Sequence, residues 1–82
     1  MDINLSPHAY RQYKKLPLSI QSIIKSTIAN LETTPYPTNS KKLSGRQGYK
    51  LRYGTYRIIY EVDKKSKKIA ILAIAHRRNI YK

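Results

Sequence analysis

The 82-residue chain contains no cysteine, no tryptophan, no phenylalanine and only four acidic residues. Without cysteine it can form neither disulfides nor thiolate metal sites, and we expect a reducing, cytoplasmic location. No stretch approaches the roughly 18 apolar residues of a membrane span. Met1–Asn4 lacks the basic and apolar regions of a secretion signal. Two distant histidines and scattered acids favour no metal site, so we expect a protein with no metal, no cofactor and no membrane partner.

The scarcity of acidic residues leaves a large positive charge. Seventeen Lys and Arg residues give the chain a formal net charge of +13. Small soluble domains usually carry a net charge of about 2–8 in magnitude, so we expect an anionic partner that neutralises this surface. An anionic membrane and an acidic protein would also serve. The chain offers no amphipathic membrane helix, however, and the charge therefore favours nucleic acid.

The first half of the chain predicts one strand and two helices. Polar–apolar alternation over Asp2–Leu5 indicates a short, half-buried strand. Ser6-Pro7 suits the N-cap and first position of a helix that reaches about Lys15. Leu16-Pro17 interrupts it, and a second helix runs to about Glu32. We expect the inner faces of these helices to carry Ala9, Tyr10, Tyr13, Ile20, Ile23, Ile24, Ile28 and Leu31.

The second half predicts a basic loop and three strands. Ser40–Gly48 is the loop, and Lys68–Ala75 is an apolar strand. Tyr49–Tyr53 and Tyr56–Val62 flank Gly54-Thr55, a pair suited to a type II′ hairpin turn. The order β-α-α-β-β-β predicts one small α+β domain over residues 1–82. Its two N-terminal helices would pack on one face of a mostly antiparallel sheet.

The hairpin register predicts a positively charged patch on one face of the sheet. A two-residue turn places Arg52 opposite Arg57, with Lys50 on the same face. Like charges directly opposite each other destabilise a sheet, and a docked anion, most simply a phosphate, would explain them. Guanidinium groups bind phosphate at two points and stay protonated. The alternative is that these side chains only solvate an exposed face.

The last strand is expected to add to this patch. Leu72 and Ile74 alternate along this strand as two core-facing residues would. The residues between and beyond them, including Ile71 and Arg77, would then lie on the open face, where Arg77 joins the other cations. His76 is a candidate for acid–base chemistry near neutral pH. Strand alternation, however, places it off the Arg77 face.

Tyr81 follows the basic cluster and could stack on an unpaired base or donate its phenol proton. Alternatively it anchors the end of the chain. If the substrate is RNA, the 2′-hydroxyl is an internal nucleophile already held beside its phosphate. The protein then needs only cations around the phosphate and groups that accept and donate a proton.

Four segments together resemble the RelE/ParE superfamily of bacterial type II toxins. They are Leu16-Pro17, the Lys-Lys-Leu-x-Gly loop at residues 41–45, the block 49–61, and the ending Ala73–Tyr81. The resemblance runs nearly end to end. In the RelE branch it implies a ribosome-dependent endonuclease that cuts mRNA in the A site without a metal.

The resemblance also implies roles for individual residues. Lys50 and Arg52 match a pair of basic strand residues, although Arg52 replaces a lysine and is a poor general base. Lys50 or His76 would then accept the proton. The implied catalytic set is Lys50, Arg52, Arg57, His76, Arg77 and Tyr81. Flanking residues expected to bind RNA are Lys41, Lys42, Arg46 and Arg78.

The implied partners are the ribosome, mRNA and a cognate acidic antitoxin that wraps the toxin in a hetero-oligomer. Operator DNA would be bound only through that antitoxin. Two alternatives stay open: a ParE-like toxin that binds DNA gyrase and cuts no RNA, and an inactive homologue that only binds RNA.

Overall fold

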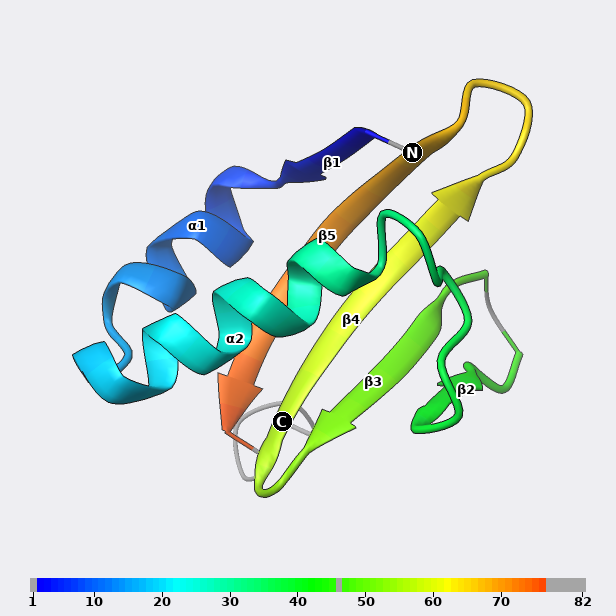
Figure 1. Ribbon diagram of the computed structural model, residues 1–82. Helices are drawn as coiled ribbons and strands as arrows, with labels where there is room; N and C mark the ends of the chain where they lie inside the picture. Colours follow the sequence, from blue (N-terminus) through cyan, green and yellow to red (C-terminus); the bar gives the residue numbers. More distant parts are fainter. Residues whose placement is uncertain (1, 46, 77–82) are drawn as a thin grey trace.

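The computed structural model describes residues 2–45 and 47–76. It contains one five-stranded sheet with the strand order β1-β5-β4-β3-β2, in which β1 runs parallel to β5 and the other neighbours are antiparallel. The predicted α+β class is confirmed (Figure 1). No helix of the described chain is long and apolar enough to cross a membrane. The elements are β1 (Asp2–Leu5), α1 (Pro7–Lys14), α2 (Leu18–Asn30), β2 (Ser40–Lys42), β3 (Tyr49–Tyr53), β4 (Tyr56–Asp63) and β5 (Lys68–His76).

Helix α1 begins at the predicted cap and lies beside β5. The Ser6 hydroxyl accepts a hydrogen bond from the backbone N–H of Ala9 at 3.0 Å, which satisfies one of the unpaired donors of the first turn. Further along, Oε1 of Gln12 accepts a hydrogen bond from the backbone N–H of Ile74 at 2.7 Å. Strand β1 ends at Leu5 and pairs only with the first half of β5, so α1 lies beside the second half of β5 (Figure 1).

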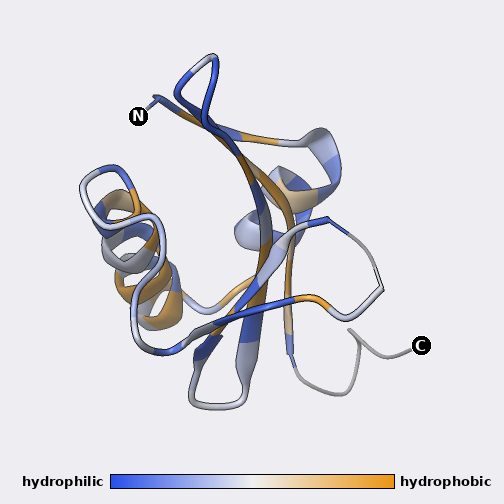
Figure 2. Cartoon of the chain, turned by 90° about the vertical axis from the view of Figure 1, so that its right-hand side faces the viewer, coloured by the Kyte–Doolittle hydropathy of each residue, from blue (hydrophilic) through white to orange (hydrophobic). Residues whose placement is uncertain are grey.

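Helix α2 lies across one face of the sheet and covers the core. Figure 2 shows it on one side of the strands. Burying an aliphatic side chain contributes about 1.5–3 kcal/mol, so this face supplies most of the stability. Contrary to the prediction, Tyr10 is 53% exposed, because α1 turns Ala9 rather than Tyr10 inward. The core consists of Ala9, Ile24, Ile28, Leu31, Leu51, Ile58, Tyr60, Ile69, Ile71 and Ile74.

The predicted basic loop contains an additional strand, β2. It pairs with β3 so that Lys41 lies opposite Lys50 and Lys42 lies opposite Tyr49. Three residues with two lysines give little strand signal, yet lysine is common on edge strands because it discourages pairing with other chains. The sheet therefore extends one strand further on the basic side than the sequence predicts.

The hairpin of β3 and β4 has the predicted register. Arg52 pairs with Arg57, and Tyr53 with Tyr56, on either side of the turn. Gly54 has a φ of +55° and Thr55 is not among the residues with positive φ, as a type II′ turn requires.

The pairing of β4 with β5 contains a register shift that the alternation rule did not predict. Ile59 pairs with Ala73 and Tyr60 with Ile71, so that Leu72 is the extra residue of a β-bulge. Ile71 consequently faces the core and is fully buried, whereas the sequence placed it on the open face. The bulge lets Ile71 and Ile74 point to the same side although they are an odd number of residues apart.

A row of tyrosines attaches the connection between α2 and β2 to the sheet. The rings of Tyr36 and Tyr49 have centroids 4.9 Å apart, and those of Tyr49 and Tyr60 are stacked at 5.6 Å. The Tyr60 hydroxyl donates a hydrogen bond to the carbonyl oxygen of Pro35 at 2.8 Å. This connection leads into β2 and so fixes the position of Asn39.

Candidate functional site

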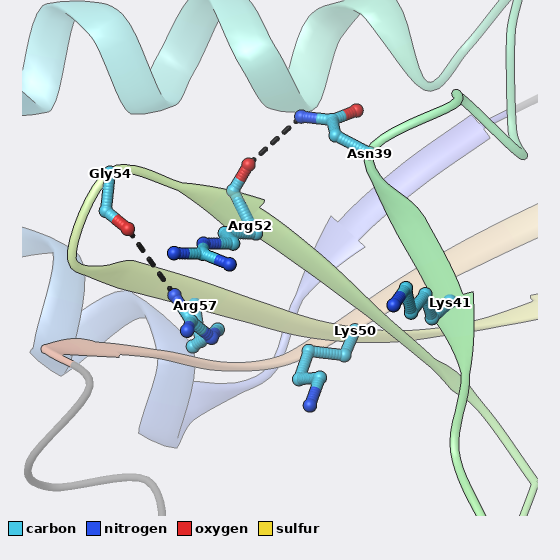
Figure 3. A pocket seen from close by; sticks show the side chains of 6 residues that line it. All are labelled: Asn39, Lys41, Lys50, Arg52, Gly54 and Arg57. Atoms are coloured by element: carbon cyan, nitrogen blue, oxygen red, sulfur yellow. Dashed lines mark hydrogen bonds between the residues drawn. The ribbon is translucent and has the colours of Figure 1, made fainter.

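A cavity of about 470 Å³ opens on the sheet face that points away from the core. Its walls come from the three neighbouring strands β2, β3 and β4 and from the hairpin turn (Figure 3). Side chains on this face alternate with the buried Leu51 and Ile58, so the pleat that fills the core also turns the cations outward. The lining residues are Asn39, Lys41, Lys50, Arg52, Gly54 and Arg57.

Arg57 is the most enclosed residue of the cavity. Only 6% of its surface is exposed, and its Nη1 donates hydrogen bonds to the carbonyl oxygens of Tyr56 at 3.2 Å and Gly54 at 3.4 Å. Its Nε is buried, and no described residue accepts a hydrogen bond from it. A buried guanidinium with an unsatisfied donor is costly for the folded state. An anion with acceptor oxygens would supply the missing partner.

The neighbours of Arg57 increase the positive potential. Arg52 lies directly opposite it on β3. On the other side, the residue of β5 that pairs with Arg57 is Ala75, whose methyl group adds no negative charge. Lys41 on β2 and Lys50 on β3 pair with each other, and Lys50 shares the face of Arg52 two residues further along β3. No carboxylate lines the described cavity, so its four cations are arranged to attract anions.

Asn39 is a cavity residue that the sequence did not identify. The backbone N–H of Arg52 donates to the carbonyl oxygen of Asn39 at 3.2 Å, and Nδ2 of Asn39 donates to the carbonyl oxygen of Arg52 at 2.9 Å (Figure 3). This reciprocal pair holds the start of β2 against the end of β3. The chain segment around Asn39 contains two prolines and reads only as an extended connection. Without knowledge of β2, no spacing relates it to Arg52.

His76 lies on the opposite side of the sheet from the cationic cavity. It pairs with Tyr56, and the two rings meet edge to face with centroids 5.5 Å apart. The strand alternation predicted this separation from the arginine face. Lys42 is also separate, because it shares the side of Tyr49 rather than that of Lys50.

The candidate residues thus divide into three groups. Lys41, Lys50, Arg52 and Arg57 meet in one cavity, whereas Lys42 and His76 lie elsewhere. The other predicted site residues, Arg46, Arg77, Arg78 and Tyr81, lie outside the described residues.

The cavity can bind a phosphate and stabilise additional negative charge on it. Arginine offers a rigid fork of donors that matches two phosphate oxygens, and lysine adds a mobile point charge. Donors held in place before an anion arrives need no reorganisation when charge develops on it. In residues 2–45 and 47–76, no group of His, Asp or Glu side chains is arranged to hold a metal ion.

A family model described as the ParE toxin of type II toxin–antitoxin systems, parDE, matches residues 3–81. A search of curated protein sequences gave no match.

Solved structures of toxin–antitoxin complexes have the same fold. A chain of the archaeal RelE–RelB complex from Pyrococcus horikoshii OT3 superposes with a TM-score of 0.84 at 27% identity, over 95% of this chain and 96% of that one. A chain of the RelBE2 complex from Mycobacterium tuberculosis gives 0.83 at 26% identity, over 93% and 96%. The intact RelBE complex of E. coli gives 0.80 over 92% and 94%, and its 19% identity supports the fold alone.

Proposed function

Because this chain belongs to the family of ParE toxins of type II toxin–antitoxin systems, we propose that it inhibits translation as a ribosome-dependent endonuclease that cleaves mRNA without a metal. The RelE/ParE fold is common to toxins with different targets, so the proposal depends on the site rather than on the fold. Its strongest support is the cavity of four cations around the buried Arg57.

In the proposed reaction, the RNA 2′-hydroxyl attacks the adjacent phosphate and the 5′-oxygen leaves. Arg57 and Arg52 bind the phosphate oxygens and stabilise the charge that develops on them. One group must accept the 2′-hydroxyl proton and another must protonate the leaving oxygen. We assign the first role to Lys50, because arginine does not deprotonate in proteins and His76 lies across the sheet from Arg57.

Arg77 and Tyr81 complete the proposal on the strength of their sequence positions. Arg77 would add a second phosphate-binding guanidinium, and Tyr81 would stack on a base beside the scissile phosphate or donate a proton to the leaving oxygen. Lys41, Arg46 and Arg78 would bind neighbouring phosphates. Contacts of this kind depend on charge rather than on sequence.

The proposed partner is an antitoxin that covers the cationic cavity. The related structures from Pyrococcus horikoshii and Mycobacterium tuberculosis are toxin–antitoxin complexes. A net charge of +13 suits an acidic antitoxin segment. Operator DNA would be contacted by the antitoxin within the same hetero-oligomer, and the complex would act in the cytoplasm.

The decisive experiment is cleavage of a defined mRNA on purified ribosomes, mapped by primer extension. We expect discrete cuts at A-site codons, no cuts in naked RNA, and no cuts with the Arg57→Met variant. Arg11→Met serves as the matched control because Arg11 is an exposed arginine of α1 that does not line the cavity. Intact mRNA with folded wild-type protein would refute the proposal.

A second candidate function is binding of DNA gyrase, and the match to the ParE family model favours it. In that case the protein would block supercoiling and leave mRNA intact. A gyrase supercoiling assay beside the ribosome assay separates the two functions, because each predicts activity in one assay alone.

A further inference from the structure

A second cavity of about 250 Å³ lies where α1 ends and where β4 begins beside the end of β5. It is formed by side chains from α1, from the connection between α1 and α2, and from the core-facing side of the two strands. The cavity is close to the cationic site in the fold, because Tyr56 and Arg57 are consecutive residues of β4 whose side chains point to opposite faces. It is lined by Gln12, Lys15, Leu16, Pro17, Tyr56, Ile74, Ala75 and His76.

Gln12 supplies a hydrogen-bond donor that is fixed in place. Its Oε1 accepts the backbone N–H of Ile74 at 2.7 Å, a short bond that sets the orientation of the whole side-chain amide. The Nε2 of the same amide carries two N–H donors, and no described residue accepts from them. A ligand with an acceptor atom on its edge would find a donor already oriented.

The remaining walls suit a flat ring. The rings of Tyr56 and His76 meet edge to face at 81° and form an aromatic corner. Leu16 and Pro17 add apolar surface opposite them. Their connection is tied to α2, because Nε2 of Gln21 donates a hydrogen bond to the carbonyl oxygen of Leu16 at 2.9 Å.

The rim of the cavity carries a positive charge. Lys15 is exposed and lines the opening. An ammonium group in this position attracts a phosphate attached to whatever occupies the cavity. An aromatic corner, a fixed amide donor and a nearby cation are the features with which proteins recognise single-stranded RNA bases.

We propose that this cavity is a nucleobase subsite. It would take the base of a nucleotide next to the phosphate that Arg57 binds, so that the RNA passes around the end of the β3–β4 hairpin. The inference rests on the proposed RNA cleavage and adds to it a source of sequence preference. It assigns His76 to base binding, which agrees with its position across the sheet from the cationic cavity.

Nucleotide titration of the full-length, 15N-labelled protein tests the subsite directly. The probes are the four nucleoside 5′-monophosphates, with ribose 5-phosphate as the control that lacks a base. We expect at least one monophosphate to shift the Gln12 side-chain amide and the Tyr56 and His76 resonances. Ribose 5-phosphate should leave these signals in place. Shifts confined to the Arg57 cavity, or none at Gln12, would overturn the proposal.

The Gln12→Glu variant provides a sharper test. Glutamate keeps the oxygen that accepts from Ile74 but replaces both amide donors, so a merely structural role predicts little change. The proposal predicts at least tenfold weaker monophosphate binding and an altered sequence preference at the cut. Gln47→Glu makes the same chemical change at an exposed position outside the cavity. Equal affinities of the two variants would refute the subsite.

His76 distinguishes stacking from proton transfer. His76→Ala removes the aromatic wall and should weaken binding at least fivefold, whereas His76→Phe keeps a ring and should weaken it less. Equal losses in the two variants would contradict a stacking role. The two proposals also fail separately: nucleotide binding at Gln12 without mRNA cleavage refutes only the cleavage, and cleavage without shifts at Gln12 refutes only the subsite.

Discussion

Replacing Arg57 by methionine should change the stability of the protein little while removing nearly all of its activity. The substitution removes two long hydrogen bonds, at 3.2 and 3.4 Å, each contributing on the order of 1 kcal/mol. It also removes the unsatisfied Nε donor, whose burial costs about 1–3 kcal/mol. Repulsion from Arg52 across the strand pair is relieved as well, by up to about 1 kcal/mol. Methionine retains most of the buried stem, so packing changes little.

These terms sum to a change between about −1 and +2 kcal/mol in the free energy of unfolding. For a domain of this size, 1 kcal/mol corresponds to about 4–8 °C in Tm. Urea titration followed by far-UV circular dichroism measures the change. Arg11→Met is the control for the loss of one positive charge, and an exposed substitution of this kind should stay within about 0.5 kcal/mol of wild type.

The activity of the same variant completes the prediction. Loss of a preorganised charge at the phosphate should reduce mRNA cleavage by about 10²–10³-fold. Inorganic phosphate should raise the Tm of the wild type by ligand linkage and leave Arg57→Met unchanged. The reasoning is refuted if Arg57→Met is more than about 1.5 kcal/mol less stable than Arg11→Met, a loss typical of a structural residue, or if its cleavage falls by less than about tenfold.

Other substitutions probe the cavity and its support. Binding of single-stranded RNA should weaken with salt at a slope of about −0.7 per phosphate contact. Lys41→Ala should flatten this slope more than Lys42→Ala, because only Lys41 lines the cavity, and equal slopes would count against the site. Burial raises the pKa of Tyr60 above its usual value, so the stability that Tyr60 confers is present below about pH 10 and is lost as the pH rises through the folded-state pKa. Tyr60→Phe should remove this loss and cost about 0.5–1.5 kcal/mol at neutral pH, as pH-dependent urea titrations will measure. Gly48→Ala should destabilise more than Gly45→Ala, since both have positive φ but only at Gly48 would a Cβ meet a backbone oxygen, at 3.1 Å; equal thermal shifts would contradict this.

The parts of the site that the sequence predicted are those set by local rules. A two-residue turn fixes strand register, so the pairing of Arg52 with Arg57 followed from Gly54-Thr55 alone. The N-cap at Ser6 and the break at Leu16-Pro17 likewise depend only on neighbouring residues. These signals decide most of the fold because the helices and the hairpin are short-range structures.

The features that were missed depend on contacts between distant segments. Strand β2 exists because β3 offers it an edge, and its own three residues carry almost no strand signal. Asn39 enters the site through that same pairing. The bulge at Leu72 reflects the need to bury both Ile71 and Ile74 in the core. The alternation of polar and apolar residues along one strand cannot reveal the bulge, since the need for it arises only when the strands and helices pack together.

The bulge also determines which side chains at the end of β5 lie on each face of the sheet. Beyond Leu72, β5 resumes pairing so that Ala75 lies beside Arg57 and His76 beside Tyr56. A shift of one residue in this pairing would place His76 opposite Arg57 and bring the imidazole to the cationic cavity instead. The register that buries Ile71 and Ile74 therefore keeps the cationic face free of His76 and places the imidazole in the second cavity. Core packing, rather than any property of the site residues, thus assigns the two faces their different chemistries.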